Sequence, residues 1–362
     1  MLDFTYIYIL TAIALMILFS VVRRSSYLAR RKNRFYMLAI SADICILLGY
    51  VGRDLSEQLS VMPLAHISNT LIYLCAPLSM FFLILAASER FDKFIGICAV
   101  LEAISVIIAL CSPFTGWFYT VSADVIYSRG PLYIYNEVLG VLFTVVWAIY
   151  SFIEFRYIET SGKIYLAELF VFQVASIIVQ GLNSTYKIIY ICGAFSIMIY
   201  YAFVTEVYGK YDRLTGVRNS LYYHAMMESA PPAAGYSVIM VDANGLKQAN
   251  DTYGHAAGDR LICEVAAAMV KSVGKKGAVY RIGGDEFVAV IRSTDAEYLG
   301  GIERAIHEQL SQIADTEVSA STGAAVNSEG ESFADTVSRA DKLMYENKNQ
   351  YYIRTGKDRR RH

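Results

Sequence analysis

Cysteine pairs, proline, tryptophan and charge are all scarce in this sequence. Its 362 residues include six cysteines, six prolines and two tryptophans, and only 18% of them are charged. No two cysteines form a C-x-x-C pair, so the pattern indicates neither a disulfide framework nor a zinc site. The formal net charge is −1, and no basic stripe is visible apart from a short tail at 357–361. We therefore expect no nucleic-acid partner.

Apolar residues are abundant, and the excess lies before residue 205. They make up 55% of the chain, and the mean hydropathy of +0.38 is high for a soluble protein. Seven apolar runs each approach the roughly 20 residues that a helix needs to cross a lipid bilayer. We expect membrane-spanning helices at about Phe4–Val22, Phe35–Tyr50, Leu64–Ala87, Phe94–Cys111, Leu132–Ile153, Ile164–Leu182 and Ile188–Val204.

Loop charges predict the orientation of these helices. Basic residues follow the first run rather than precede it, which favours a membrane helix over a cleaved signal peptide. The loops after the first, third and fifth runs carry most of the positive charge, which places them in the cytoplasm. Seven crossings then put the N-terminus outside and everything after Val204 in the cytosol. The charges concerned are Arg23, Arg24, Arg30, Arg31, Lys32, Arg34, Arg90, Lys93, Arg156 and Lys163.

The acids Asp43, Glu102 and Glu168 fall inside apolar runs. A charge in a bilayer is expensive and normally faces the bundle interior or water. Two interpretations stay open: hydrogen-bonded or neutral packing groups, or a sensory ligand site. The long connection at 112–131 is rich in aromatic residues, which favours an interfacial aromatic belt over a ligand-binding lid.

The composition divides the chain into three parts: a seven-helix membrane region at 1–204, a short connection at 205–216 and a cytosolic domain at 217–362. The connection is too short for a stable coiled coil. After it, we expect helices at 217–228, 256–273 and 296–313, strands at 236–241, 278–282, 287–291 and 318–326, and a last helix capped by Ser332 and Asp335. This order predicts a βαββαβ-type α+β sandwich.

Carboxylates follow the ends of two of these strands. In Tyr280-Arg-Ile-Gly-Gly-Asp-Glu-Phe287, two glycines allow a tight turn that presents Asp285 and Glu286. Gly-Gly-Asp alone is ordinary hairpin chemistry. Asp242 ends a second, buried-type strand upstream. Two strand ends that each supply a carboxylate suggest a divalent-metal site for phosphoryl chemistry.

Five ordered motifs in the second half resemble the GGDEF family of diguanylate cyclases. The resemblance runs from about Lys210 to Lys348. The motifs are Asp212-Arg-Leu-Thr-Gly216-Val-Arg-Asn219, Asp242-Ala-Asn244-Gly-Leu-Lys247-Gln-Ala-Asn250-Asp251-Thr-Tyr-Gly254-His255-Ala-Ala-Gly258-Asp259, Gly283-Gly-Asp-Glu-Phe287, Ser321-Thr-Gly323 and Ala340-Asp-Lys-Leu-Met-Tyr345-Glu-Asn-Lys348. The helical region, with its Tyr127–Tyr133 segment, looks like seven-helix sensor modules of bacterial signalling proteins.

The resemblance implies a cyclase-like palm with a central sheet flanked by helices, which condenses two GTP into cyclic di-GMP and releases two pyrophosphates. It implies Mg²⁺, with Mn²⁺ as the alternative, bound by Asp242, Asp285 and the carbonyl of Ala243. Glu286 is implied as the base or metal-linked activator of the 3′-hydroxyl. Asp285 and Lys247 complete the catalytic set.

The remaining site residues implied by the resemblance contact the nucleotide. Lys247 and Lys348 would neutralise the β- and γ-phosphates, and Asn250 and Asp259 would read guanine. The backbone of Gly245, Leu246 and Lys247 would cradle phosphate oxygens, and Gly283 and Gly284 would let phosphates approach the turn.

One such domain holds one GTP, so the reaction implies a homodimer with two domains face to face. The implied location is the bacterial inner membrane, with regulation by the helical region and downstream cyclic di-GMP receptors. Three departures from the family pattern stand out: Ser220 and Tyr352 each replace an arginine, and the product-inhibition motif is absent from 274–277.

Three other functions compete with a membrane-bound cyclase. The first is a catalytically silent GGDEF receptor that binds GTP or a protein partner. The second is a transporter or channel with a regulatory domain, which no internal repeat supports. The third is a related cyclase that makes mixed GMP-AMP products, against which Asp259 argues as a guanine reader.

Overall fold

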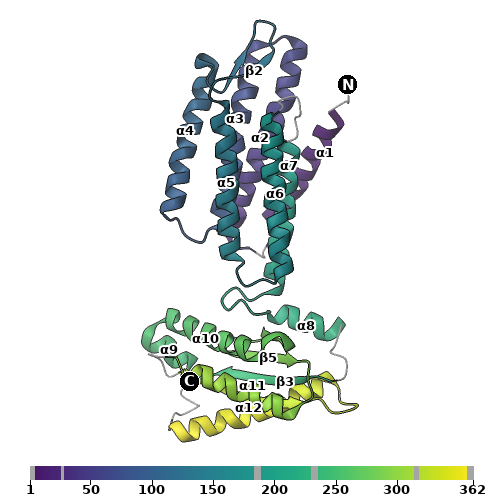
Figure 1. The fold of residues 1–362 in the computed structure, drawn as a ribbon, viewed down its shortest axis with the longest axis vertical. Coiled ribbons are helices and arrows are strands. Elements are labelled where there is room, and N and C mark those ends of the chain that lie inside the picture. The colour runs from purple at the N-terminus through teal and green to yellow at the C-terminus, as the bar shows by residue number, and fades with distance from the viewer. Residues whose placement is uncertain (1–4, 26–27, 183–188, 230–234, 314–317, 357–362) are drawn as a thin grey trace. The chain divides into compact units, whose positions relative to one another are not determined.

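The computed structural model describes residues 5–25, 28–182, 189–229, 235–313 and 318–356. Within it the chain divides into two compact units, Met1–Thr205 and Glu206–His362. The expected seven spanning helices are confirmed, because the described residues contain seven helices long and apolar enough to cross a membrane (Figure 1). Their bounds are α1 Thr5–Arg24, α2 Arg30–Leu59, α3 Met62–Ala87, α4 Lys93–Thr115, α5 Tyr133–Glu154, α6 Thr160–Leu182 and α7 Ile189–Lys210.

Helix α2 is much longer than its apolar run predicted, because charged residues at both ends find partners inside the bundle. Lys32 is buried and forms an ion pair with Glu154 of α5. Near the other end, Arg53 is 7% exposed. Its guanidinium lies 4.7 Å from the ring centroid of Tyr50 and 4.8 Å from that of Tyr127. Such cation–π contacts let an arginine be buried without a carboxylate partner.

The connection between α4 and α5 forms a two-stranded antiparallel ribbon, β1 (Tyr119–Val121) and β2 (Tyr127–Arg129). Phe118 and Tyr119 are fully buried and stack on Tyr73 of α3, with centroid distances of 5.0 and 6.0 Å. The Tyr127 and Tyr73 hydroxyls lie 2.7 Å apart. These aromatic side chains therefore pack within the protein.

The second unit is an α+β sandwich built on one antiparallel sheet in the order β4-β5-β3-β6, which confirms the expected fold class. Figure 1 shows α10 and α11 alongside this sheet. The element bounds are α8 Ser220–Ser229, β3 Ser237–Ala243, α9 Leu246–Tyr253, α10 His255–Val273, the 3₁₀ turn η1 Gly274–Lys276, β4 Gly277–Arg281, β5 Glu286–Ile291, α11 Ala296–Ser311, β6 Ala320–Val326 and α12 Phe333–Thr355.

Both faces of the sheet are buried, and β3 shows how its residues divide between them. Ile239 and Val241 pack in one core with α10 and α11. Val238 and Met240 pack in the other core, with α12. Since side chains alternate along a strand, Asp242 belongs to the second face, toward α12.

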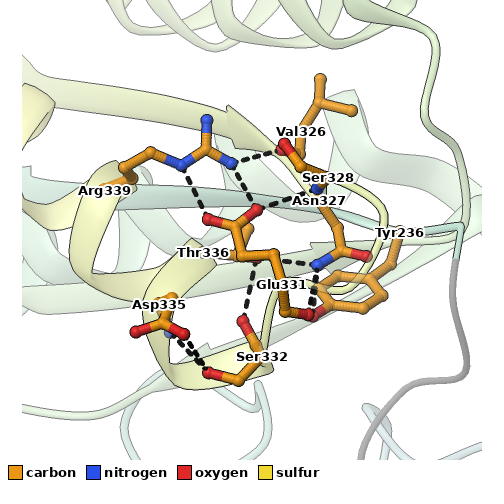
Figure 2. Close-up of polar contacts among 9 residues, drawn as sticks. All are labelled: Tyr236, Val326, Asn327, Ser328, Glu331, Ser332, Asp335, Thr336 and Arg339. Atoms are coloured by element: carbon orange, nitrogen blue, oxygen red, sulfur yellow. Dashed lines mark hydrogen bonds and ion pairs between the residues drawn. The ribbon is translucent and has the colours of Figure 1, made fainter.

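A polar network anchors the beginning of α12 (Figure 2). The capping interaction expected there is confirmed: the Ser332 hydroxyl accepts a hydrogen bond from the Asp335 backbone N–H. Arg339 forms an ion pair with Glu331 at 2.7 Å and donates to the Val326 carbonyl at the end of β6. The hydrogen bond from Arg339 lowers the pKa of Glu331. These contacts bind the start of α12 to β6, the strand on which it packs.

Candidate nucleotide and metal site

The sheet register brings the two carboxylate-bearing strand ends together. Asp242 on β3 lies directly opposite Glu286 on β5. One residue on, the Ala243 N–H donates to the Asp285 carbonyl at 3.0 Å. Cβ atoms of directly opposed residues in an antiparallel pair are about 4.5–5.5 Å apart. The structure therefore brings Asp242, Asp285 and Glu286 together at one end of the two central strands, β3 and β5.

Asp242 is buried, 2% exposed, and has one partnered and one unpartnered oxygen. Its Oδ2 accepts a hydrogen bond from Lys348 Nζ of α12 at 2.6 Å. Its Oδ1 has no hydrogen-bond partner within the described part of the chain. Burial raises the pKa of Asp242 to about 6, with a further increase from the Asp285 charge that the Lys348 contact opposes. For Lys348, burial alone would lower the pKa, but the bond to Asp242 outweighs it and the pKa is raised.

The Gly-Gly turn leaves space for Glu286. A β-carbon on Gly283 would lie 2.6 Å from Glu286 Oε2, so a side chain there would displace the carboxylate. Around Gly284 no atom lies within 4 Å of the β-carbon position, which leaves this side of the turn open. Backbone bonds from Ile282 and Gly283 to the Glu286 carbonyl close the turn.

Arg281 stabilises this turn by bonding both to its backbone and to Asp212, a role that was not predicted from the sequence. Its Nη2 donates to the Gly284 carbonyl at 2.7 Å, and its Nη1 pairs with Asp212 Oδ1 at 3.0 Å. The same Asp212 oxygen accepts from the Thr215 backbone and hydroxyl. The first motif, Asp212-Arg-Leu-Thr-Gly216, is thus linked to the acidic turn. The arginine two residues before the glycines was the available signal.

The segment after β3 is a short helix, α9, which was not among the helices expected from the sequence. Gly245 caps it with a φ of 76°, a conformation that favours glycine. The N–H groups at 245–247 therefore lie at a helix N-terminus, where anions are favoured. Lys247 is exposed in its first turn. The helix was missed because its eight residues are mostly polar.

Gly258, the chain neighbour of Asp259 in α10, lets Asn250 of α9 lie against that helix. A β-carbon on Gly258 would lie 2.1 Å from Asn250 Oδ1, so only glycine lets this amide rest against α10. Asn250 is half-buried, and Asp259 is exposed in the first turns of the same helix. An amide and a carboxylate supplied by these two adjoining helices could read adjacent donors and acceptors of a base edge.

The Ser321-Thr-Gly323 motif on β6 positions the site through its contacts with β3 and α12. Ser321 donates to Asn244 Oδ1 at 2.9 Å, which ties the end of β3 to β6. A β-carbon on Gly323 would lie 2.1 Å from the Met344 backbone nitrogen, so its absence lets α12 lie directly on β6. That close packing brings Lys348 to Asp242.

Tyr352 lies one helical turn after Lys348, within electrostatic range of it. Arg354 is exposed and lies about 120° around the helix from Lys348 at 100° per residue.

The protein side chains alone supply only part of the ligands that a hard divalent cation needs. No group of three or more His, Cys, Asp and Glu side chains in the described ranges is close enough to hold a metal by itself. Asp242, with its unpartnered buried oxygen, and the neighbouring Asp285 supply two carboxylates. Mg²⁺ is commonly bound by one or two carboxylates together with substrate phosphates, and this pair fits that arrangement.

The second half of the chain is similar to known proteins. Residues 209–352 match the family model described as "Diguanylate cyclase, GGDEF domain". Diguanylate cyclase DgcS of Shewanella oneidensis is 32% identical over 150 residues, which cover 38% of this chain and 49% of that protein. An uncharacterised 19.3 kDa protein of Streptomyces ambofaciens is 39% identical over 101 residues, covering 27% of this chain and 54% of that protein. The chain thus spans about half the length of these relatives.

Among solved structures, the coiled coil and GGDEF domain of DgcB from Caulobacter crescentus, in complex with c-di-GMP, is 22% identical. The match covers 42% of this chain and 87% of that one, with a TM-score of 0.38. Residues 209–352 of this chain are therefore similar to the GGDEF domains of diguanylate cyclases, and seven apolar helices precede them in the described part of the chain.

Proposed function

We propose that this protein is an active, membrane-bound diguanylate cyclase that condenses two GTP into cyclic di-GMP and two pyrophosphates. One observation carries the proposal: the register that places Asp242 opposite Glu286, beside Asp285 and Lys348. The domain family and the relatives' names support the reaction class.

In this mechanism, the 3′-hydroxyl oxygen of one GTP attacks the α-phosphorus of the other. An O–P bond forms, the bond to the pyrophosphate leaving group breaks, and the hydroxyl proton goes to Glu286. Mg²⁺ or Mn²⁺ held by Asp242, Asp285 and the Ala243 carbonyl would offset the charge that builds on the phosphates. Lys348 and Lys247 would add positive charge at the β- and γ-phosphates.

Recognition of guanine is assigned to the Asn250–Asp259 pair, and the phosphates to the N-terminus of α9 and the open side of the Gly283-Gly284 turn. Both groups of residues lie on segments that flank the end of β3. Because each domain holds one GTP, we propose that catalysis needs a homodimer, in which correct positioning alone supplies on the order of 7–11 kcal/mol.

We further propose that residues 1–204 act as a membrane sensor, that 205–216 form a signalling connection and that the catalytic domain at 217–362 is cytoplasmic. The positive charge of alternate loops supports this orientation. Helix α7 continues to Lys210. The Asn219 backbone N–H donates a hydrogen bond to the Lys210 carbonyl, so the connection begins as a helix and then folds back rather than running extended.

The deciding experiment compares GTP turnover with Mg²⁺ by the full-length wild type and Glu286→Gln. We expect cyclic di-GMP from the wild type and a loss of at least about 100-fold in the variant, the scale of a lost general base. If the wild type binds GTP but makes no product under any condition, the silent-receptor alternative replaces this proposal.

A further inference from the structure

A small cavity lies inside the seven-helix unit, lined mostly by apolar residues together with four polar ones, among spans where polar groups are expensive. Side chains from α2, α3, α5, α6 and α7 line it, and its volume is about 30 Å³. A single water-sized particle needs about 10–15 Å³ by this measure, so the cavity has room for about two or three such particles rather than for an organic ligand. Its polar lining residues are Asp43, Asn136, Glu137 and Gln173.

Asp43 is the buried acid of this cavity. It is 2% exposed, and its Oδ2 has no hydrogen-bond partner within the described residues. Gly193 of α7 faces that oxygen: a β-carbon there would lie 3.2 Å from Oδ2. An unpaired carboxylate at such a position is strongly unfavourable unless a cation accompanies it or it is protonated.

Asn136 presents an oxygen because its nitrogen is already engaged. Pro77 lies inside α3 and lacks the N–H that would bond to the Tyr73 carbonyl. Asn136 Nδ2 donates to that carbonyl at 3.0 Å instead. A carbonyl only accepts, so the amide orientation is fixed and the side-chain oxygen is left for another contact.

The remaining lining residues set the charge of the cavity. Gln173 Oε1 accepts from Ser196 at 2.6 Å and keeps a second lone pair. Glu137 lies within electrostatic range of Arg129. Arg129 itself bonds the carbonyls at the end of α6. Arg129 thus opposes part of a charge on Glu137, whereas no basic side chain of the described residues is paired with Asp43.

We propose that this cavity binds one dehydrated monovalent cation, of the alkali-metal class, with Asp43 as the charged ligand and amide oxygens of Asn136 and Gln173 as neutral ligands. Hard cations take oxygen ligands, and a single uncompensated charge suits a monovalent ion. Two further acids of the spanning helices lie elsewhere: Glu168 is exposed on α6, and Glu102 is buried on α4 but does not line this cavity.

The test measures the melting temperature of the full-length protein in nanodiscs as NaCl replaces choline chloride at constant ionic strength. We expect a saturable rise of a few degrees in the wild type, because a ligand that binds only the folded state stabilises it. Asp43→Asn should abolish the rise, and Glu168→Gln, an acid outside the cavity, should retain it. Binding of ²²Na⁺, competed by K⁺ or Na⁺ but not by choline, should follow the same pattern.

Gly193→Ala gives a second variant if Asp43→Asn does not fold, since the added methyl crowds Oδ2 and should weaken the sodium response. A wild-type melting temperature that is equal in Na⁺, K⁺ and choline would overturn the proposal, as would a full response in Asp43→Asn. A dependence on pH alone, with none on the cation, would show Asp43 to be simply protonated and would likewise refute the site. None of these outcomes depends on cyclase activity.

Discussion

At the scale of single residues, the second unit places a lysine and a carboxylate in a contact that neither sequence neighbourhood reveals. Lys348 and Asp242 are 106 positions apart, yet Nζ and Oδ2 lie 2.6 Å apart. The sequence analysis assigned Lys348 to the phosphates and Asp242 to the metal. The contact suggests that the lysine also compensates the buried carboxylate when no metal is bound.

We expect Lys348→Met to destabilise the domain more in EDTA than in saturating Mg²⁺. Without the lysine, the buried Asp242 carboxylate has no compensating charge, and a bound divalent ion would restore one. Removing one partner of a buried pair costs about 3–5 kcal/mol, and partial solvent access of the lysine should reduce this. Melting temperatures of the full-length protein in the two buffers provide the measurement.

Lys247→Met is the matched control, because Lys247 is an exposed lysine on α9 and has no ion pair among the described residues. Its melting temperature should stay within about a degree of the wild type, as expected of a surface substitution. Equal destabilisation of Lys348→Met with and without Mg²⁺ would contradict the charge argument.

At the scale of elements, packing of α12 on β6 decides where Lys348 lies. Most elements of the second unit were predictable, because alternating and helical apolar patterns are local signals. Helix α9 was not, since its polar residues follow neither pattern. The close approach of α12 was also invisible: Gly323 was quoted within a motif, but only the fold shows that a β-carbon there would meet the helix backbone.

We expect Gly323→Ala to lower the free energy of unfolding of the cytosolic unit by about 1–3 kcal/mol, the usual cost of overpacking. The clash is with the backbone of Met344 and Ala340, which no rotamer change can relieve. Helix α12 must therefore shift, and GTP turnover should fall even below the melting temperature. Urea midpoints and initial rates check both effects.

The control for this change is Gly301→Ala in α11, where the nearest atom to an added β-carbon is an Arg304 side-chain nitrogen at 4.0 Å. Alanine there should be neutral or slightly stabilising, since it favours helix over glycine. If both substitutions behave alike, the close approach at Gly323 is not what positions the helix.

At the scale of the whole molecule, the proposed reaction needs two copies of a chain that supplies one site each. Co-expression of wild type with Glu286→Gln in equal amounts tests this. If both phosphoester bonds need Glu286 in each partner, random pairing leaves only wild-type homodimers active, about one quarter of the all-wild-type rate.

Independent monomers would instead retain about one half of the rate at the same total protein. The measurement is cyclic di-GMP production by purified mixed protein, with the ratio of the two chains determined by mass spectrometry. A result near one half would remove the homodimer from the proposed mechanism.

By itself, the sequence determined the number of membrane-length helices, the fold class of the second unit and the resemblance of residues 209–352 to GGDEF domains. Each follows from local pattern: runs of apolar residues, strand and helix periodicity, and motif order. The tertiary structure alone decided the rest. It pairs Asp242 with Lys348, fastens the acidic turn through Arg281 to Asp212, and buries Asp43 while leaving Glu168 exposed. These outcomes depend on contacts between distant segments, which local periodicity does not encode.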